Sequence, residues 1–261
     1  MAGWDRARFY MIDGAEYPSV TTILGIIDKS GPLMNWAVNE ERATFKDALL
    51  DVLTRDKTPT VDTIWQEVEK ATKGVKAHKK ASDKAAAIGT AAHAYIEWRT
   101  KGLLGIDKGD EPVIPDAARL AVMAWEDWAK AVEFRPVFSE RVVYHPRYGY
   151  AGTLDMLAYV KDRLTVIDWK TGKAVYPEAY LQNVAYRAAL AYQENIPVNA
   201  DGPYQGLILR LPKTLDDPAF EPVWVPDDTT MVPFLAALDL WRWQRQASGQ
   251  KVGTLPTSGN L

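Results

Sequence analysis

Two aspartates and a lysine stand inside apolar, strand-like sequence, where a purely structural protein would gain nothing from charge. Asp155 follows Gly152-Thr153-Leu154, and Asp168 and Lys170 end the run Leu164-Thr165-Val166-Ile167. Residues two apart in a strand lie on the same face, so we expect Asp168 and Lys170 to point together. Two acids beside a base form a site for a hard divalent cation and a water molecule.

Each of these residues also has a purely structural interpretation. Asp155 could be a turn residue at the end of a strand, and Asp168 with Lys170 could form a surface ion pair worth about 0–1 kcal/mol. A following helix carries Gln182 and Tyr186, which are four residues apart and therefore share one face. The joint occurrence of these residues, in this order on strands and a helix, favours a functional site.

The elements that must position these residues follow from the periodicity of apolar residues and from the places of glycine and proline. Residues 1–17 predict a short extended hairpin, and Ser19 is the expected N-cap of the next helix. The other predicted helices cover about residues 31–53, 60–72, 75–100, 115–133, 177–194 and 228–247. The predicted strands cover residues 135–145, 150–160, 163–170, 204–211 and 221–225.

This order of elements predicts an α/β (α+β) fold, in which helices flank a mixed central sheet. Residues 1–133 are expected to form a helical N-terminal elaboration that packs on the core and contributes His93 to it. Residues 134–247 are expected to form the core, and residues 248–261, rich in small and polar residues, a disordered tail. All three parts are expected to belong to one structural domain.

Composition excludes several kinds of chemistry. The 261 residues include no cysteine, which excludes disulfides, thiolate catalysis and an iron–sulfur cluster. No Gly-x-x-x-x-Gly-Lys-Ser/Thr loop and no dinucleotide fingerprint is present, so we expect no nucleotide cofactor. The net charge of −3 means that any contact with nucleic acid must come from local patches. Without a signal core or a membrane-spanning apolar run, the chain is expected to be cytoplasmic with no membrane partner.

The motifs together resemble those of the PD-(D/E)XK nuclease superfamily, in its RecB-like exonuclease branch. The matching elements are Gly152-x-x-Asp155, Asp168-x-Lys170 and Gln182-x-x-x-Tyr186. Residues 17–24, 89–97 and 149–155 are in addition similar to the mitochondrial genome maintenance exonuclease and its phage and bacterial relatives. The resemblance spans roughly residues 17–245, is strongest over 140–190, and implies a restriction-endonuclease-like core.

The resemblance implies a metal site. Asp155 and Asp168 would bind the cation, with the backbone carbonyl of Trp169 and the side chain of His93 as further ligands. A histidine considered alone would more often be a helix residue whose ring nitrogens are hydrogen-bonded or exposed to solvent. Oxygen ligands with one imidazole suit one or two Mg²⁺ or Mn²⁺ ions. Such an ion lowers the pKa of water and offsets the charge that develops on the phosphate.

The resemblance also implies catalytic roles around this metal. Lys170 would orient or activate the attacking water and balance phosphate charge, while Gln182 and Tyr186 would support the site and the substrate backbone. Glu140 stands where related nucleases often carry a glutamate. It would hold Lys170 or reach the metal through water, or it is a charge on an edge strand.

Contacts with DNA are predicted at three places. The hydroxyls of Ser19, Thr21 and Thr22 could meet a phosphate at a helix start, although an N-capped helix explains them equally. Lys173 follows the Lys170 strand in a glycine-containing loop. Lys80 and Lys84 belong to a basic stripe with Lys76 and Lys79, which could equally be a solvated helix face.

These features predict a Mg²⁺/Mn²⁺-dependent deoxyribonuclease, an exonuclease that hydrolyses phosphodiester bonds and leaves a 5′-phosphate. The expected setting is phage or bacterial DNA recombination, replication or repair, in the bacterial cytoplasm if the chain is phage-encoded. The expected partners are a single- or double-stranded DNA end and a recombination or replication protein. Two alternatives stay open: a structure-specific endonuclease of the same fold, and a DNA-binding or assembly module without turnover.

Overall fold

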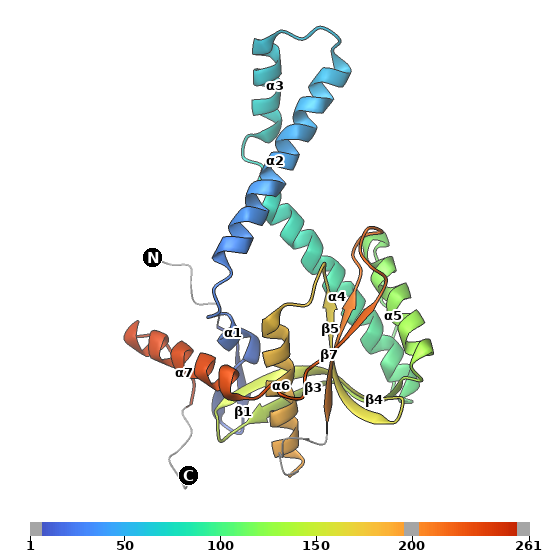
Figure 1. Ribbon diagram of the computed structural model, residues 1–261, viewed down its shortest axis with the longest axis vertical. Helices are drawn as coiled ribbons and strands as arrows, with labels where there is room; N and C mark the ends of the chain where they lie inside the picture. The colour runs from blue at the N-terminus through green and yellow to red at the C-terminus, as the bar shows by residue number, and fades with distance from the viewer. Residues whose placement is uncertain (1–6, 196–203, 255–261) are drawn as a thin grey trace. The chain divides into compact units, whose positions relative to one another are not determined.

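The computed structural model describes residues 7–195 and 204–254, and the chain divides into two compact units. One unit comprises residues 1–27 and 88–261, and the other comprises residues 28–87. Figure 1 traces the chain through both. This division falls inside the helical part predicted over residues 1–133 and not at its end, and the domain boundaries named above stay predictions.

The unit of residues 28–87 is helical, as expected from its sequence. It contains α2 (Ser30–Arg55), α3 (Val61–Thr72) and the first part of α4 (Ala77–Leu103). Thr60 caps α3 by accepting a hydrogen bond from the backbone N–H of Thr63. The rings of Phe45 and Trp65 pair α2 with α3 at a centroid distance of 6.1 Å.

A five-stranded mixed sheet forms the centre of the other unit. Its order is β3 (Arg135–His145), β4 (Tyr150–Val160), β5 (Arg163–Thr171), β6 (Gln205–Leu211) and β7 (Glu221–Trp224). Only β5 and β6 pair in parallel, because α6 (Pro177–Gln193) crosses over between them. The mixed sheet and the order β-β-β-α-β-β confirm the predicted fold class.

Helices cover both faces of this sheet, each over its own apolar cluster (Figure 1). One face packs against α1 (Val20–Leu24), α6 and α7 (Val232–Ala247). The other packs against the second part of α4 and against α5 (Arg119–Ala131), which follows the short 3-10 helix η1 (Asp116–Ala118). Along the described residues, no helix is both long and apolar enough to cross a lipid bilayer.

The last helix begins later than its sequence pattern predicts. We expected a helix over residues 228–247, and α7 begins at Val232. Pro233 lies in the first turn, where its missing N–H leaves no hydrogen bond unmade. The proline therefore fixes the start of the helix, and residues 228–231 stay outside it.

The predicted N-terminal hairpin is confirmed, and part of the predicted tail is ordered beside it. β1 (Phe9–Ile12) pairs with β2 (Ala15–Pro18) around the turn at Asp13-Gly14. Thr254 donates its backbone N–H to the carbonyl of Glu16 (2.8 Å), and its hydroxyl accepts from the N–H of Glu16 (2.8 Å). The tail expected over residues 248–261 is thus fixed to β2 at residue 254, and residues 255–261 lie outside the described residues.

A buried histidine ends the first strand of the sheet. His145 is 5% exposed, and its ring lies 4.5 Å from that of Tyr148 and 4.6 Å from that of Tyr192. Its Nδ1 has no hydrogen-bond partner among the described residues. Burial lowers the pKa of His145 to about 4, so the ring is neutral at physiological pH.

We predict that this histidine makes the fold sensitive to acid. An unfolded histidine titrates near pH 6.5 and the folded one near 4, so the unfolded chain binds the extra proton between these values. The free energy of unfolding should fall by about 2 kcal/mol between pH 7 and pH 5 through this residue. Denaturant unfolding of wild type and His145→Phe at both pH values measures it. Equal acid losses in the two proteins would contradict the prediction.

Candidate active site

The strands that carry Asp155 and Asp168 separate where these residues stand. Backbone pairing of β4 with β5 ends at Met156 and Ile167. Beyond that point the backbone N–H of Trp169 donates to Oδ2 of Asp155 at 2.9 Å. The Asp155 carboxylate thus accepts a hydrogen bond from a backbone N–H beyond the last pair of the two strands. The gap between the strands holds acidic side chains.

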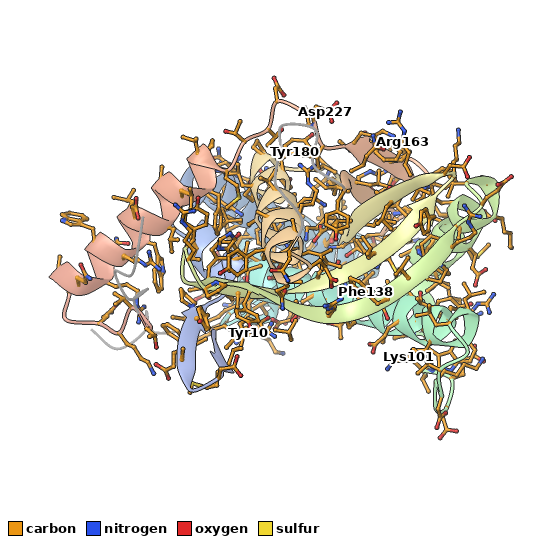
Figure 2. All side chains as sticks on the ribbon, turned by 90° about the horizontal axis from the view of Figure 1, so that it is seen from below. Tyr10, Lys101, Phe138, Arg163, Tyr180 and Asp227 are labelled. Atoms are coloured by element: carbon orange, nitrogen blue, oxygen red, sulfur yellow. The ribbon has the colours of Figure 1, made fainter. Side chains whose placement is uncertain are left out.

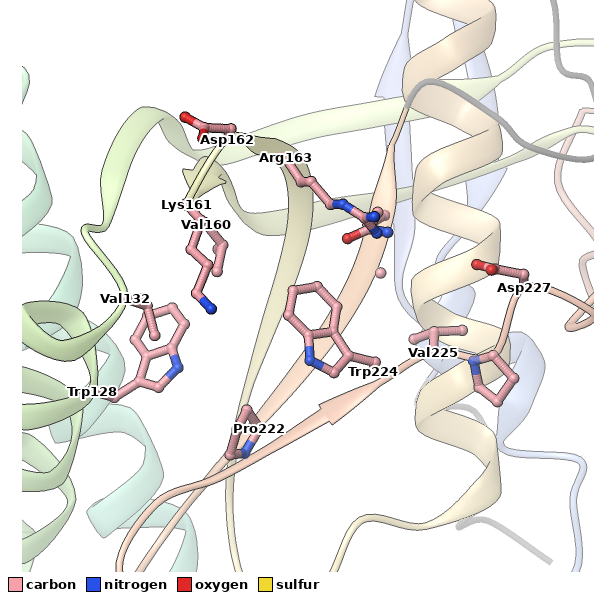
Figure 3. A pocket seen from close by; sticks show the side chains of 13 residues that line it. Trp128, Val132, Val160, Lys161, Asp162, Arg163, Pro222, Trp224, Val225 and Asp227 are labelled. Carbon is pink, nitrogen blue, oxygen red and sulfur yellow. The ribbon is translucent and has the colours of Figure 1, made fainter.

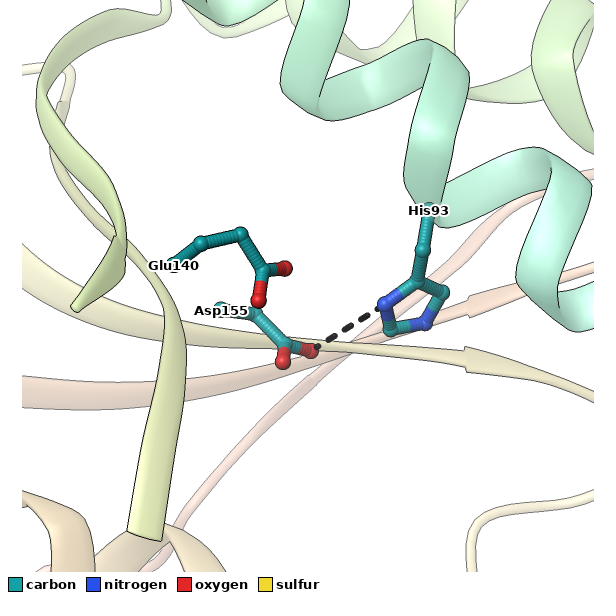
Figure 4. Close-up of side chains that lie close together, drawn as sticks. All are labelled: His93, Glu140 and Asp155. Atoms are coloured by element: carbon teal, nitrogen blue, oxygen red, sulfur yellow. Dashed lines mark ion pairs between the residues drawn. The ribbon is translucent and has the colours of Figure 1, made fainter. Parts of the chain in front are cut away.

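Three potential metal ligands gather at this gap (Figure 4). His93, Glu140 and Asp155 each offer one ligand atom within 4.8 Å of the others. His93 Nδ1 lies 3.9 Å from Asp155 Oδ2. His93 and Asp155 were expected together from the sequence, whereas Glu140 was expected at Lys170 or at the metal, or as an edge charge.

A glycine lets α4 approach the sheet closely enough to bring His93 to the site. A Cβ atom on Gly89, one turn before His93, would come 3.0 Å from the hydroxyl oxygen of Thr171 on β5. His93 Nε2 lies 3.1 Å from the carbonyl oxygen of Trp169. In the tautomer that donates from Nε2, the ring is held by this carbonyl and Nδ1 keeps its lone pair beside Asp155.

Glu140 reaches the group through an unusual backbone conformation. Its φ is 50°, although it stands in strand β3 between two residues that pair with β4. A non-glycine residue in this left-handed region costs about 1–3 kcal/mol and is a feature of functional sites. Partial removal of the carboxyl group from water and the nearby Asp155 raise the pKa of Glu140 to about 7, while the residue as a whole stays exposed.

A second group, built on β5 and α6, lies next to the first. Lys170 Nζ lies 2.9 Å from Oδ1 and 2.6 Å from Oδ2 of Asp168, as the alternation of a strand predicts. Gln182 accepts from Lys170 (3.2 Å) and donates to Asp168 Oδ1 (3.0 Å). It also lies 3.2 Å from the hydroxyl of Tyr186, so both helix residues face Asp168.

Burial decides the electrostatics of the pair. Asp168 is 1% exposed, and burial raises its pKa to about 6 although Lys170 acts in the opposite direction. Burial works against the charged form of Lys170, but the negative charges of Asp168 and Asp155 outweigh it and raise the pKa of the lysine. Lys170 is therefore an ammonium group at neutral pH.

The glycine of the Gly-Thr-Leu-Asp motif makes room for Tyr186. A Cβ atom on Gly152 would lie 2.4 Å from Cε1 of the Tyr186 ring, closer than real atoms come. Asn183, the neighbour of Gln182, donates to the carbonyl of Val166 on β5 (3.1 Å). Close packing and this hydrogen bond fix α6 against the strands that carry the acids.

A family model of the PD-(D/E)XK nuclease superfamily matches residues 65–248, more than half of the chain. The chain belongs to the PD-(D/E)XK nuclease superfamily. Membership makes it a nuclease, implies DNA as its substrate, and brings with it the general use of divalent metal ions. No curated protein matches the sequence.

The donor set of this nuclease fits a divalent cation. Asp155 and Glu140 supply carboxylate oxygens and His93 a ring nitrogen, which together suit a hard cation that tolerates imidazole. Oδ2 of Asp168 is buried and accepts no hydrogen bond among the described residues, although Lys170 is close. The Trp169 carbonyl, a predicted ligand, lies beside His93.

The predicted DNA contacts lie in different surroundings. Ser19 is 2% exposed, and its hydroxyl caps α1 by accepting from the N–H of Thr22 (3.0 Å) and donating to the Thr22 hydroxyl (2.8 Å). Thr21 and Lys173 are exposed. Lys80 and Lys84 are exposed within residues 28–87. These DNA contacts stay predictions, and the cap explains Ser19 without them.

Sequence reasoning missed one residue of the nuclease site. Arg210 is fully buried, stands beside Lys170 in the sheet register, and donates to Glu221 (2.7 Å) and to the carbonyl of Gly172 (3.2 Å). It therefore fixes the segment that follows Lys170. The signal was a charge inside the apolar run of residues 206–211, the same kind of signal that marked Asp168.

A hollow of about 750 Å³ lies elsewhere on the nuclease (Figure 3). Trp128, Arg163, Trp224 and Asp227 are among the residues that line it. It contains none of the ligand residues named above, and Arg163 stands at the opposite end of β5 from Lys170. This hollow is therefore separate from the acidic site.

We predict that Gly152→Ala distorts the site by displacing Tyr186. The new methyl group must push the ring from Gln182, and overpacking of this kind costs about 1–3 kcal/mol. Thermal and denaturant unfolding measure the loss, and cleavage should fall with it. Gly31→Ala is the matched control, because no atom lies within 4 Å of its new Cβ. A Gly152→Ala protein as stable and active as this control would contradict the prediction.

Proposed function

We propose that the chain is a Mg²⁺- or Mn²⁺-dependent exodeoxyribonuclease of the RecB-like branch. The observation that carries the proposal is one site with two adjoining parts. His93, Glu140 and Asp155 form a ligand group, and beside it the buried carboxylate of Asp168 forms an ion pair with the partly exposed Lys170. A carboxylate is costly to bury without a purpose, because it loses its hydration.

The reaction proposed is hydrolysis of a DNA phosphodiester. A water oxygen forms a new bond to phosphorus, the bond from phosphorus to the 3′ oxygen breaks, and a proton passes from the water to that leaving oxygen. The products are a 3′-hydroxyl and a 5′-phosphate. A divalent cation held by His93, Glu140 and Asp155, with Asp168 adjoining, would activate water and offset phosphate charge.

Lys170 would act as a fixed cation towards the substrate. Its ammonium group is charged at neutral pH and is held by Asp168 and Gln182, so little reorganisation is needed when negative charge develops. Tyr186 would keep Gln182 in place through their hydrogen bond. The chain's own contribution is thus a preorganised ammonium group beside the ligand group.

The exonuclease mode and the biological setting are proposed from the resemblance stated above. The motifs at residues 17–24, 89–97 and 149–155 support the branch of exonucleases that work in phage and bacterial DNA recombination, replication or repair. A strand end of DNA would be the substrate, and a protein of those processes would be the partner. Cytoplasmic action follows from that setting.

We predict that Lys170→Ala abolishes cleavage but leaves Mn²⁺ binding within about threefold of wild type. The lysine contributes charge to the reaction and is no ligand, since ammonium groups do not bind cations. Cleavage of a labelled oligonucleotide and titration of Mn²⁺ by calorimetry measure the two effects. Lys130→Ala, an exposed lysine on α5, is the control and should keep both properties. Full activity in Lys170→Ala would remove the lysine from the mechanism.

We predict that linear DNA is degraded while covalently closed circular DNA survives, and that EDTA stops the reaction. An exonuclease needs a strand end, and the ligand group needs its cation. Gel analysis of both substrates with Mg²⁺, Mn²⁺ or EDTA makes the measurement. Nicking of the circle would instead identify an endonuclease. DNA binding without cleavage under every metal would identify a module that lacks turnover.

A further inference from the structure

The N-terminal hairpin presents two different faces. Phe9 on β1 lies against Trp241 of α7, with a centroid distance of 6.2 Å. Because side chains alternate along a strand, Arg8 and Tyr10 share the opposite face. The hydroxyls of Tyr10 and Thr153 are 2.9 Å apart, so this second face meets β4.

Thr153 connects the hairpin face to the site. It precedes Asp155 by two residues on β4, which places the two side chains about 7 Å apart along the same side of the strand. Burial and the negative charges of Asp168 and Asp155 raise the pKa of Tyr186 well above its ordinary value, and Tyr10 contributes in the same direction. The hydrogen bond to Thr153 thus places the Tyr10 hydroxyl on β4 two residues from Asp155.

Tyr10 in turn holds a guanidinium group. The Cζ atom of Arg8 lies 4.8 Å from the centroid of the Tyr10 ring, within the range of a cation–π contact. Arg8 is exposed, and no carboxylate of the described residues forms an ion pair with it. Its backbone is fixed, since its N–H donates to the Thr22 hydroxyl (3.0 Å) and its carbonyl accepts from the N–H of Ser19 (2.9 Å).

A fixed guanidinium that forms no ion pair among the described residues, next to the proposed nuclease site, has an evident ligand. Arginine offers a planar fork of donors that matches phosphate oxygens, and prior immobilisation lowers the entropy lost on binding. Thr254 forms two hydrogen bonds with Glu16 on β2, and these bonds hold the hairpin in place. Rigid placement and free charge are together what a phosphate contact requires.

We propose that Arg8, seated on Tyr10, binds a backbone phosphate of the DNA strand next to the phosphate that is cleaved. The proposal rests on the proposed function and extends it from the reacting group to the path of the strand. Tyr10 serves as the support, because its ring carries the guanidinium and its hydroxyl is tied to Thr153. Figure 2 shows Tyr10 on the hairpin that bears the pair.

The test is binding of a labelled single-stranded oligonucleotide by the full chain in EDTA, measured by fluorescence anisotropy over a range of KCl concentrations. Arg8→Gln should weaken binding about tenfold, the effect of one charge-assisted contact. It should also reduce the slope of log affinity against log salt by about 0.7, the share of one single-strand phosphate. Arg8→Lys should restore the slope, and Tyr10→Phe should weaken binding about threefold, because the ring stays and the hydrogen bond goes.

Arg163→Gln is the matched control. Arg163 is likewise exposed, but it stands at the opposite end of β5 from Lys170 and apart from Tyr10 (Figure 2). It should change neither affinity nor salt slope. With metal, Arg8→Gln should raise KM and leave kcat within about twofold, because the arginine holds the strand and not the reacting phosphate.

The outcomes separate the two proposals. If wild type cleaves linear DNA while Arg8→Gln keeps wild-type affinity, salt slope and KM, the arginine contact is wrong and the nuclease proposal stands. An equal loss in Arg163→Gln also overturns the contact, since a general field and no specific arginine would then explain binding. If wild type cleaves no DNA with any divalent metal, the proposed function itself fails.

Discussion

The site depends on the point at which β4 and β5 part. While two strands stay paired, their backbone groups satisfy each other and leave no space for a ligand. After Met156 and Ile167 the pairing ends, and the N–H of Trp169 is satisfied by the carboxylate of Asp155. The carbonyl of Trp169 is met by His93. The backbone of one residue, Trp169, therefore fixes both an acid, through its N–H, and an imidazole, through its carbonyl.

The ring of Trp169 fixes the position of that residue by packing in the apolar core. It lies edge-on to Trp125 at 6.3 Å and to Trp128 at 5.7 Å, within the apolar cluster that α4 and α5 form on their face of the sheet. Aromatic pairs in this geometry contribute about 0.5–1.5 kcal/mol beyond the area they bury. The position of the polar groups at the gap is thus set by large apolar side chains that touch no substrate.

Spacing and polarity of the sequence were sufficient to predict much of this arrangement. Asp168 and Lys170 stood out because charge is rare inside a strand of buried aliphatic residues, and Gln182 and Tyr186 because they share a helix face. The same argument applied to Arg210 would have found it. The order of the elements also predicted the mixed sheet, since one helix between two strands favours a parallel pair.

Other features depend on tertiary structure and leave no trace in composition. The positive φ of Glu140 exists only because β3 is held on both sides of it, and glutamate is an unusual residue for that conformation. The neutral state of His145 follows from the tyrosines that surround it. The start of α7 shows the converse, because Pro233 is a local signal that outweighed the wider apolar periodicity.

The contact between Glu16 and Thr254 joins residues that are made at opposite times during synthesis. A ribosome builds the hairpin early, but the hydrogen bonds between Glu16 and Thr254 cannot form until residue 254 has been translated. Nascent nuclease would therefore fix the hairpin only after the strands of the sheet and their covering helices have been made. The acidic residues Asp155 and Asp168 are therefore synthesised well before the residue that completes the hydrogen bonds of the hairpin.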